Sequence, residues 1–219
     1  MTLQNIKKLV IAFGLSSFCA MSFAADEAVV ADANKGKTYA ESVCVACHGV
    51  EGNGVDPNAP VTMYPLIAGQ HAEYIAKQLK DFVGVGDQPA ARHNDIMSPM
   101  AMAVPAEDIV HVAAWFAKQK INPSKATADA AVLKAGEQLW RFGNAKKGIP
   151  ACAGCHGQEG HGLPAQYPSL AGQYPEYTES QLKLFRSGER ANGPMMRVIA
   201  EKMSDKEIQA VSQYAAGLR

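Results

Sequence analysis

Two short motifs in this chain combine cysteine and histidine at a spacing that suits covalent attachment of a metalloporphyrin. Cys-x-x-Cys-His occurs at Cys44 to His48 and again at Cys152 to His156. In one helical turn the two thiols point to the same edge of a flat ring, and the histidine that follows can reach a metal at its centre. This motif is typical of haem c attachment. We therefore predict two covalently bound haem c groups, attached through Cys44, Cys47, Cys152 and Cys155, with His48 and His156 as axial ligands of the iron.

Other chemistries also use paired cysteines, namely a thioredoxin-like redox pair, a four-cysteine zinc site and ordinary buried thiols. The two pairs in this chain are 108 residues apart, and each is followed directly by a histidine and then by Gly49 or Gly157. The added histidine and the long separation favour haem attachment over the three alternatives. Two such sites in one chain indicate electron transfer.

The N-terminal residues have the order of an export signal. Lys7 and Lys8 precede an apolar run from Leu9 to Phe18, and the small residues of Ser22 to Ala24 follow it. The run is too short for a permanent transmembrane helix. We therefore expect residues 1–24 to be a cleaved signal peptide and the mature chain to be a soluble protein of the periplasm.

An internal repeat indicates two tandem domains. The segment Tyr64 to Gln70 recurs 103 positions later as Tyr167 to Gln173, and a Gln-Leu pair follows each copy at the same offset. The boundary is expected within residues 121–128, where Asn122-Pro123-Ser124 ends one helix. We predict domain 1 over residues 25–122 and domain 2 over residues 123–219.

Apolar residues recur at helical spacing in both halves, and no strand pattern competes with them. The expected fold class is all-α, with each domain wrapped around one haem, because domains of under 100 residues have only a marginal apolar core of their own. The predicted helices cover residues 34–43, 71–83 and 105–118 in domain 1, and 129–141, 175–186 and 204–217 in domain 2.

Each iron needs a sixth ligand, and methionine sulfur favours the ferrous state that electron carriers use. The candidates are Met97, Met100 and Met102 in domain 1, and Met195, Met196 and Met203 in domain 2. An offset of 99 residues, taken from the last helix of each half, pairs Met97 with Met196. We predict these two as axial ligands, with Met100 and Met195 as substitutes. His71, His93 and His111 have no histidine at the matching positions of domain 2, which disfavours ligation by two histidines.

The chain resembles the two-haem cytochromes c4, which are tandem repeats of the class I cytochrome c domain. The resemblance rests on Cys-x-x-Cys-His-Gly in both halves, the segments Pro65 to Gln70 and Pro168 to Gln173, the Gln-Leu pairs and Met196-Arg197. It implies that the carbonyls of Pro65 and Pro168 accept hydrogen bonds from the axial histidines, and that Met97 and Met196 complete the two iron sites.

With both axial positions filled, no small-molecule substrate binds the iron, so the expected function is electron carriage and not catalysis. The resemblance implies a respiratory chain, with a quinol-cytochrome c reductase and a terminal oxidase as redox partners. The carrier is expected to be either free or loosely associated with the membrane. A cytochrome subunit of a periplasmic dehydrogenase and a dihaem peroxidase stay open as alternatives. Acidic residues are in excess in residues 25–122 and basic residues in 123–219, which could orient charged partners. No basic stripe indicates nucleic acid.

Overall fold

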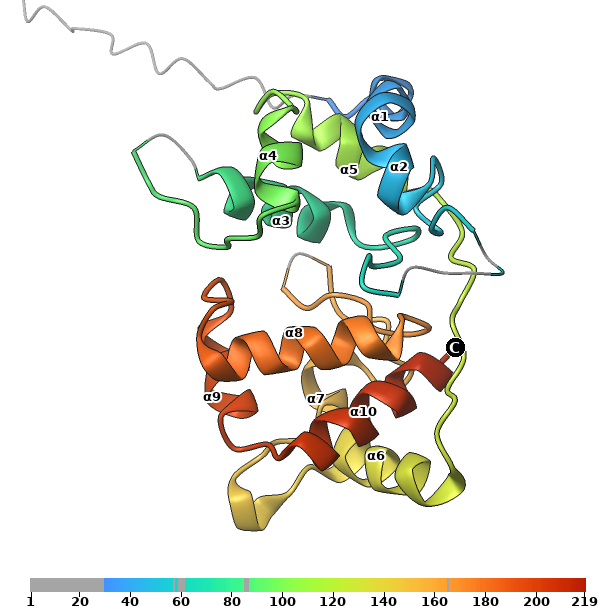
Figure 1. Cartoon of the computed structure of the whole chain (residues 1–219), viewed down its shortest axis with the longest axis vertical. Helices are drawn as coiled ribbons and strands as arrows, with labels where there is room; N and C mark the ends of the chain where they lie inside the picture. Colours follow the sequence, from blue (N-terminus) through green and yellow to red (C-terminus); the bar gives the residue numbers. More distant parts are fainter. Residues whose placement is uncertain (1–29, 57, 59–61, 85–86, 165) are drawn as a thin grey trace, which may run out of the picture.

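The computed structural model describes residues 30–219 except 57, 59–61, 85–86 and 165, and these residues form two helical domains (Figure 1). An extended linker joins the last helix of domain 1 to the first helix of domain 2 along one side of the molecule (Figure 1). The described residues form no sheet. Asn144 pairs with Ile149, and Leu163 pairs with Tyr167, only as isolated β-bridges. The predicted signal peptide, residues 1–24, lies outside the described residues.

Domain 1 begins with a nearly continuous helical run that contains the first motif. Asp32 caps the start of this run by accepting a hydrogen bond from the backbone N–H of Asn34 at 2.8 Å. A π-helical turn interrupts the run and ends on Cys44, the first residue of the motif, as is frequent at functional sites. The elements of domain 1 are α1 (Ala33–Tyr39), η1 (Ala40–Cys44), α2 (Val45–His48), α3 (Ala72–Val83), α4 (Met97–Met102) and α5 (Ile109–Ala117).

Domain 2 repeats this order with similar starts and stops. Asp129 caps the first helix, and Ser204 and Glu207 form a reciprocal capping box at the last one. Its elements are α6 (Ala130–Phe142), the 3-10 turn η2 (Ala145–Lys147), α7 (Ala153–His156), α8 (Pro175–Ser187), α9 (Pro194–Ala200) and α10 (Asp205–Gly217).

The structure differs from the predicted helices in two respects: the short helices α4 and α9 were not predicted, and α5 begins later than expected. The sequence predicts a helix from Pro105, whereas α5 begins at Ile109 because residues 105–108 form a separate turn, closed by the Asp108 N–H donating to Pro105 O at 2.9 Å. The Asp108 carboxylate accepts a hydrogen bond from the Tyr39 hydroxyl at 2.5 Å. This contact ties the turn to α1.

In each domain the first and last helices cross at a glycine. A side chain at Gly36 in α1 would place its Cβ 1.9 Å from His111 O in α5, and one at Gly136 in α6 would place it 2.1 Å from Ala210 O in α10. The two helix pairs therefore approach backbone to backbone, which a residue larger than glycine would prevent. Glycine at these crossings sets the distance between the first and last helices of each domain.

Each domain has its own apolar core between its helices. Val112 and Phe116 are fully buried in domain 1, and Trp140 and Ile208 are fully buried in domain 2. The two cores are separate clusters, as two tandem domains require. Among the described residues, no helix is both long and apolar enough to cross a membrane.

Candidate haem sites

Both Cys-x-x-Cys-His motifs form a single helical turn that ends at a glycine. Gly49 after α2 and Gly157 after α7 have φ of 69° and 79°, a left-handed conformation that favours glycine. The chain then folds back, because Gly54 N donates to His48 O at 2.8 Å and Gly162 N donates to His156 O at 2.7 Å. This turn holds two cysteines and one histidine on a short rigid segment in each domain.

The two motifs lie in different domains, with α2 in domain 1 and α7 in domain 2 (Figure 1). The four cysteines therefore do not converge, and a single four-cysteine zinc site is ruled out. Burial raises the pKa of Cys44 to about 11 and that of Cys152 to about 11. These thiols are thus protonated at neutral pH and partly enclosed, which does not suit a thioredoxin-like nucleophile.

The histidine of each motif is buried and held by one carbonyl group. His48 Nδ1 lies 3.0 Å from Pro65 O, and His156 Nδ1 lies 3.1 Å from Pro168 O. Because a carbonyl only accepts, the proton must be on Nδ1, and the lone pair of Nε2 is the one that can bind a metal. Burial lowers the pKa of both histidines, which the hydrogen bond to the carbonyl partly offsets. Both rings are therefore neutral ligand-type imidazoles.

Trp side chains from different helices anchor the loop that follows each motif. Trp115 Nε1 in α5 donates to Val50 O at 2.7 Å, and Trp140 Nε1 in α6 donates to Gln158 O at 3.0 Å. Val50 and Gln158 occupy the same place, two residues after the histidine of each motif. The repeat in the sequence does not reveal this, because the two tryptophans are not at matching positions.

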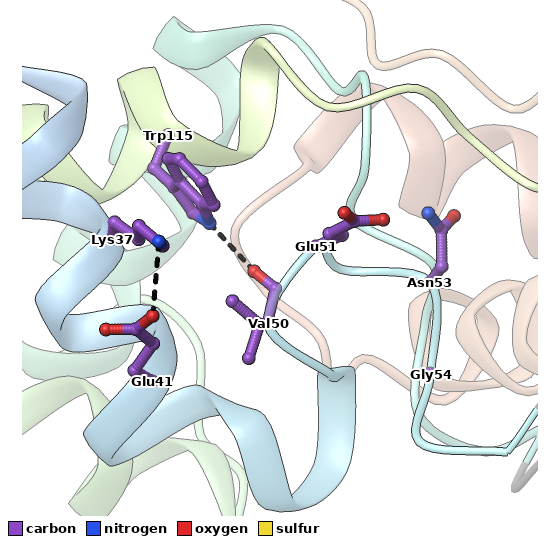
Figure 2. Close-up of a pocket in the computed structure, with 7 residues that line it drawn as sticks. All are labelled: Lys37, Glu41, Val50, Glu51, Asn53, Gly54 and Trp115. Atoms are coloured by element: carbon purple, nitrogen blue, oxygen red, sulfur yellow. Dashed lines mark hydrogen bonds and ion pairs between the residues drawn. The ribbon is translucent and has the colours of Figure 1, made fainter.

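A cavity of about 500 Å³ opens beside the anchored loop of domain 1 (Figure 2). Lys37 lies over the Trp115 ring and pairs with Glu41 at 3.4 Å. The cavity is lined by Lys37, Glu41, Val50, Glu51, Asn53, Gly54 and Trp115. Since neither cysteine nor the histidine of the motif lines it, the cavity is separate from the haem attachment point.

The structure separates the candidate methionines by burial. Met97 begins α4 and Met196 lies in the first turn of α9, and both are partly buried. Met100 and Met195 are 42% and 57% exposed. Met203 is buried in the core of domain 2, where it packs as an apolar side chain. Burial therefore favours Met97 and Met196 over the substitutes.

The remaining histidines have structural or surface positions. His111 is buried, and its Nδ1 accepts a hydrogen bond from Asp32 N at 2.8 Å, so it ties α5 to the start of α1. His93 is exposed beside Asp95. His71 contacts the carbonyl of His161 in the other domain at 2.8 Å, and the His161 side chain is exposed.

The contact between the domains contains two buried arginines that sequence reasoning had missed. Arg92 of domain 1 donates to Gln78 at 2.6 Å and, across the contact, to Gln181 at 2.8 Å and to the Tyr177 hydroxyl at 3.4 Å. Its guanidinium lies 4.5 Å from the centre of the Phe82 ring. Arg92 is therefore shared between the two domains.

Arg190 of domain 2 mirrors this arrangement. It donates to Gln181 at 2.8 Å within its own domain, and to the Tyr74 hydroxyl at 3.0 Å and Gln78 at 3.1 Å across the contact. Its guanidinium lies 4.3 Å from the centre of the Phe185 ring. The sequence contained a partial signal for this contact, because Gln78 and Gln181 belong to the repeated Gln-Leu pairs. The two arginines do not recur at the offset of those pairs, so the repeat did not reveal them.

Neither arginine makes an ion pair with an acidic side chain in the described part of the chain. Burial alone would raise the pKa of Tyr177, but the two guanidinium groups beside it lower that pKa. Two buried positive charges that share neutral partners favour a nearby anion. We name this group, centred on Arg92 and Arg190, the arginine cluster.

Comparisons with known proteins identify the family. The cytochrome c family model matches residues 33–120 and again residues 133–218. Cytochrome c4 of Thiocapsa roseopersicina is 43% identical over 193 residues, covering 86% of this chain and 94% of the relative. The crystal structure of reduced recombinant cytochrome c4 from Pseudomonas stutzeri has a TM-score of 0.77 and 38% identity, covering 87% of this chain and 100% of that one.

This chain belongs to the cytochrome c4 family. As a cytochrome c4, it is an electron-transfer protein with two tandem cytochrome c domains and two covalent haem c groups. A further relative is the thiosulfate dehydrogenase electron acceptor of Thiomonas intermedia, 37% identical over 177 residues, which cover 79% of this chain and 77% of that protein.

The residues of this cytochrome c4 fit two haem groups on physical grounds. Each domain offers two thiols on one helical turn, a neutral imidazole with Nε2 available, and partly buried thioethers. The donor set thus matches both the covalent attachment and the iron of each haem.

Proposed function

We propose that this protein is a periplasmic electron carrier of a respiratory chain that receives electrons from a quinol-oxidising complex and passes them to a terminal oxidase. The observation that carries the proposal is the pair of buried histidines, each with Nδ1 bonded to one carbonyl. A haem held this way supplies one-electron exchange between its ferric and ferrous states. The chain's role is to hold each haem in a dry pocket and to fix its ligands.

His48 with Met97, and His156 with Met196, are proposed as the axial pairs. Burial supports this assignment, since the competing residues Met100 and Met195 are 42% and 57% exposed. Two strong protein ligands leave no position on either iron for a substrate, which separates a carrier from a peroxidase. The hydrogen bonds that His48 and His156 donate to the carbonyls of Pro65 and Pro168 would keep both imidazoles in orientation.

Optical spectra of single variants test this assignment. Met97→Ala and Met196→Ala should each remove half of the far-red band that arises from sulfur bound to ferric iron. Met100→Ala and Met195→Ala are matched controls, because each removes an exposed methionine from the same helix as the proposed ligand, and they should keep the whole band. Loss of the band in a control variant, or its full retention in Met97→Ala, would reassign the ligand.

Export and the domain boundary complete the proposal. Residues 1–24 should be absent from protein recovered from the periplasm, and intact-mass measurement should give a chain beginning at Ala25 with two haem groups added. We propose residues 25–122 and 123–219 as the two domains, with the boundary inside the linker between Ala117 of α5 and Ala130 of α6. A chain that keeps its first residues in the mature protein would refute the export step.

A second candidate function is acceptance of electrons from a periplasmic dehydrogenase. The similarity to the thiosulfate dehydrogenase electron acceptor of Thiomonas intermedia favours it. Stopped-flow reduction of the purified protein by a thiosulfate dehydrogenase with thiosulfate, compared with reduction by a quinol-cytochrome c reductase with quinol, separates the two candidates. The faster donor at equal concentration identifies the physiological class, and turnover of hydrogen peroxide would instead support the peroxidase alternative.

A further inference from the structure

One peptide group in domain 1 links the proposed axial histidine to the other domain. The oxygen of the Pro65–Leu66 peptide is Pro65 O, which accepts from His48 Nδ1 at 3.0 Å. The N–H of the same peptide belongs to Leu66, and it donates to Gln173 Oε1 of domain 2 at 2.9 Å. His48 and Gln173 thus bond to opposite ends of one peptide group.

The same arrangement occurs in the opposite direction. His156 Nδ1 lies 3.1 Å from Pro168 O, and the N–H of the same peptide, on Ser169, donates to Gln70 Oε1 of domain 1 at 2.9 Å. The offset of 103 residues relates Leu66 to Ser169 and Gln70 to Gln173. Each domain therefore sends one glutamine to the peptide behind the axial histidine of its neighbour.

Both glutamine side chains are held firmly in this position. Gln173 Nε2 donates to Leu66 O at 2.8 Å, and its Oε1 also accepts from the N–H of Tyr174 at 3.0 Å. Gln70 Nε2 donates to Ser169 O at 2.9 Å, and its Oε1 accepts from the following N–H at 3.0 Å. Gln173 is 6% exposed and Gln70 is 9% exposed. Water therefore competes little for these bonds.

Hydrogen bonds in such a chain strengthen one another. When a peptide donates its N–H to a glutamine oxygen, the electron density on the carbonyl oxygen of the same peptide increases. That carbonyl oxygen becomes a better acceptor for the imidazole N–H. A histidine with a stronger Nδ1 hydrogen bond is a more basic ligand, and a more basic ligand favours the oxidised metal. Loss of the glutamine should therefore favour the reduced metal in the neighbouring domain.

We propose that Gln173 is a positioning residue for His48 and that Gln70 is a positioning residue for His156, so that each domain tunes the electron affinity of the other domain's haem. This inference rests on the proposed function, since it takes the two histidines as axial ligands. The Leu66 contact is fully buried and the Ser169 contact only partly buried. The effect of Gln173 on domain 1 therefore exceeds that of Gln70 on domain 2.

The test uses the holoprotein with Gln173→Met and Gln70→Met, which keep the length of the side chain and remove its amide. Spectroelectrochemical titration gives the midpoint potential of each haem. Nuclear magnetic resonance during stepwise oxidation assigns each potential to a domain, and in the ferrous protein it reports the His Nδ1–H shift. For Gln173→Met we expect the domain 1 haem alone to shift toward the ferrous form, with the ferric-to-ferrous ratio at fixed potential falling about twofold. Gln70→Met should shift domain 2 alone.

Gln213→Met is the matched control. The Gln213 Oε1 accepts from the backbone N–H groups of Thr127 and Ala128 inside domain 2 and touches no peptide behind a histidine. It should leave both potentials and both Nδ1–H shifts unchanged. The hydrogen bonds of the arginine cluster across the domain contact do not involve Gln70 or Gln173, so we expect the domains to stay joined in both glutamine variants. Small-angle scattering of those variants checks that the domains have not separated.

The proposal predicts a crosswise pattern that general loosening of the contact does not give. Equal shifts of both haems in one variant, a shift confined to the variant's own domain, or no shift at all would overturn it. Failure of the proposed function is detected separately, because a wild-type spectrum without histidine–methionine ligation would show it before any glutamine is changed.

Discussion

Replacing Gly36 by alanine should destabilise domain 1 and leave domain 2 intact. The new Cβ would lie 1.9 Å from His111 O and 2.9 Å from Trp115 Cβ. Carbon and carbonyl oxygen ordinarily approach no closer than about 3.3 Å. Helices α1 and α5 must therefore separate by more than about 1 Å, because the nearest atom belongs to backbone and cannot rotate away.

The magnitude follows from two opposing effects. Overpacking of a tight contact costs about 3 kcal/mol, and alanine is a better helix former than glycine by about 1 kcal/mol. The expected net loss is roughly 2 kcal/mol of unfolding free energy, which lowers the melting temperature of a domain of this size by roughly 10 °C.

Thermal unfolding followed by the haem absorbance of each domain measures this loss. Gly154→Ala is the matched control, because its Cβ would meet nothing within 4 Å and the equivalent position of the first motif, Ala46, already carries alanine. The control should be neutral or slightly stabilising. If Gly36→Ala melted within 2 °C of the wild type, the close approach of α1 and α5 would be refuted.

Three further changes test separate parts of the structure. Arg92→Gln removes one buried positive charge from the arginine cluster, so the potential of at least one haem should fall in spectroelectrochemical titration, while the exposed control Arg141→Gln leaves both potentials unchanged. Burial would raise the pKa of Glu207, but hydrogen bonds from Lys147 and from neighbouring polar groups outweigh it and lower the pKa to about 2. The stability that this carboxylate contributes is therefore complete above about pH 4.5 and is lost as the pH falls toward 2, and Glu207→Gln should flatten the acid unfolding curve of domain 2 in that range. Trp115→Phe removes the indole N–H that donates to Val50 O. It should lower the free energy of unfolding by about 1 kcal/mol in denaturant titration and leave the optical spectrum unchanged.

Much of the fold could be predicted because its signals are local. The caps Asp129 and Ser204 lie directly before the helices that they start, and the periodic apolar residues that follow define the buried face. The prediction for α5 was wrong by four residues, because proline can begin either a helix or a turn. The contact of Asp108 with Tyr39 in a distant helix selects the turn.

The candidate sites divide in the same way. The attachment cysteines and histidines stand in five-residue motifs, so their chemistry is visible without a structure. The methionine ligands have no such motif and remain a proposal that burial at Met97 and Met196 supports. Trp115 and Trp140 perform one task from unmatched positions, so no repeat could have paired them.

The sequence by itself determined that there are two haem attachment sites, two domains and an all-α fold. Motif spacing and helical periodicity depend on neighbours within a few residues along the chain, and the internal repeat appears when one half of the sequence is compared with the other. Only the tertiary structure decided which side chain from the other domain bonds to the peptide behind each histidine. Gln70 and Gln173 occupy the same position in the two copies of the repeat. The repeat alone does not show what either side chain contacts. Their partners lie about a hundred residues away and meet them only when the domains dock face to face, so the hydrogen bonds that join the two proposed iron sites exist only in the folded pair.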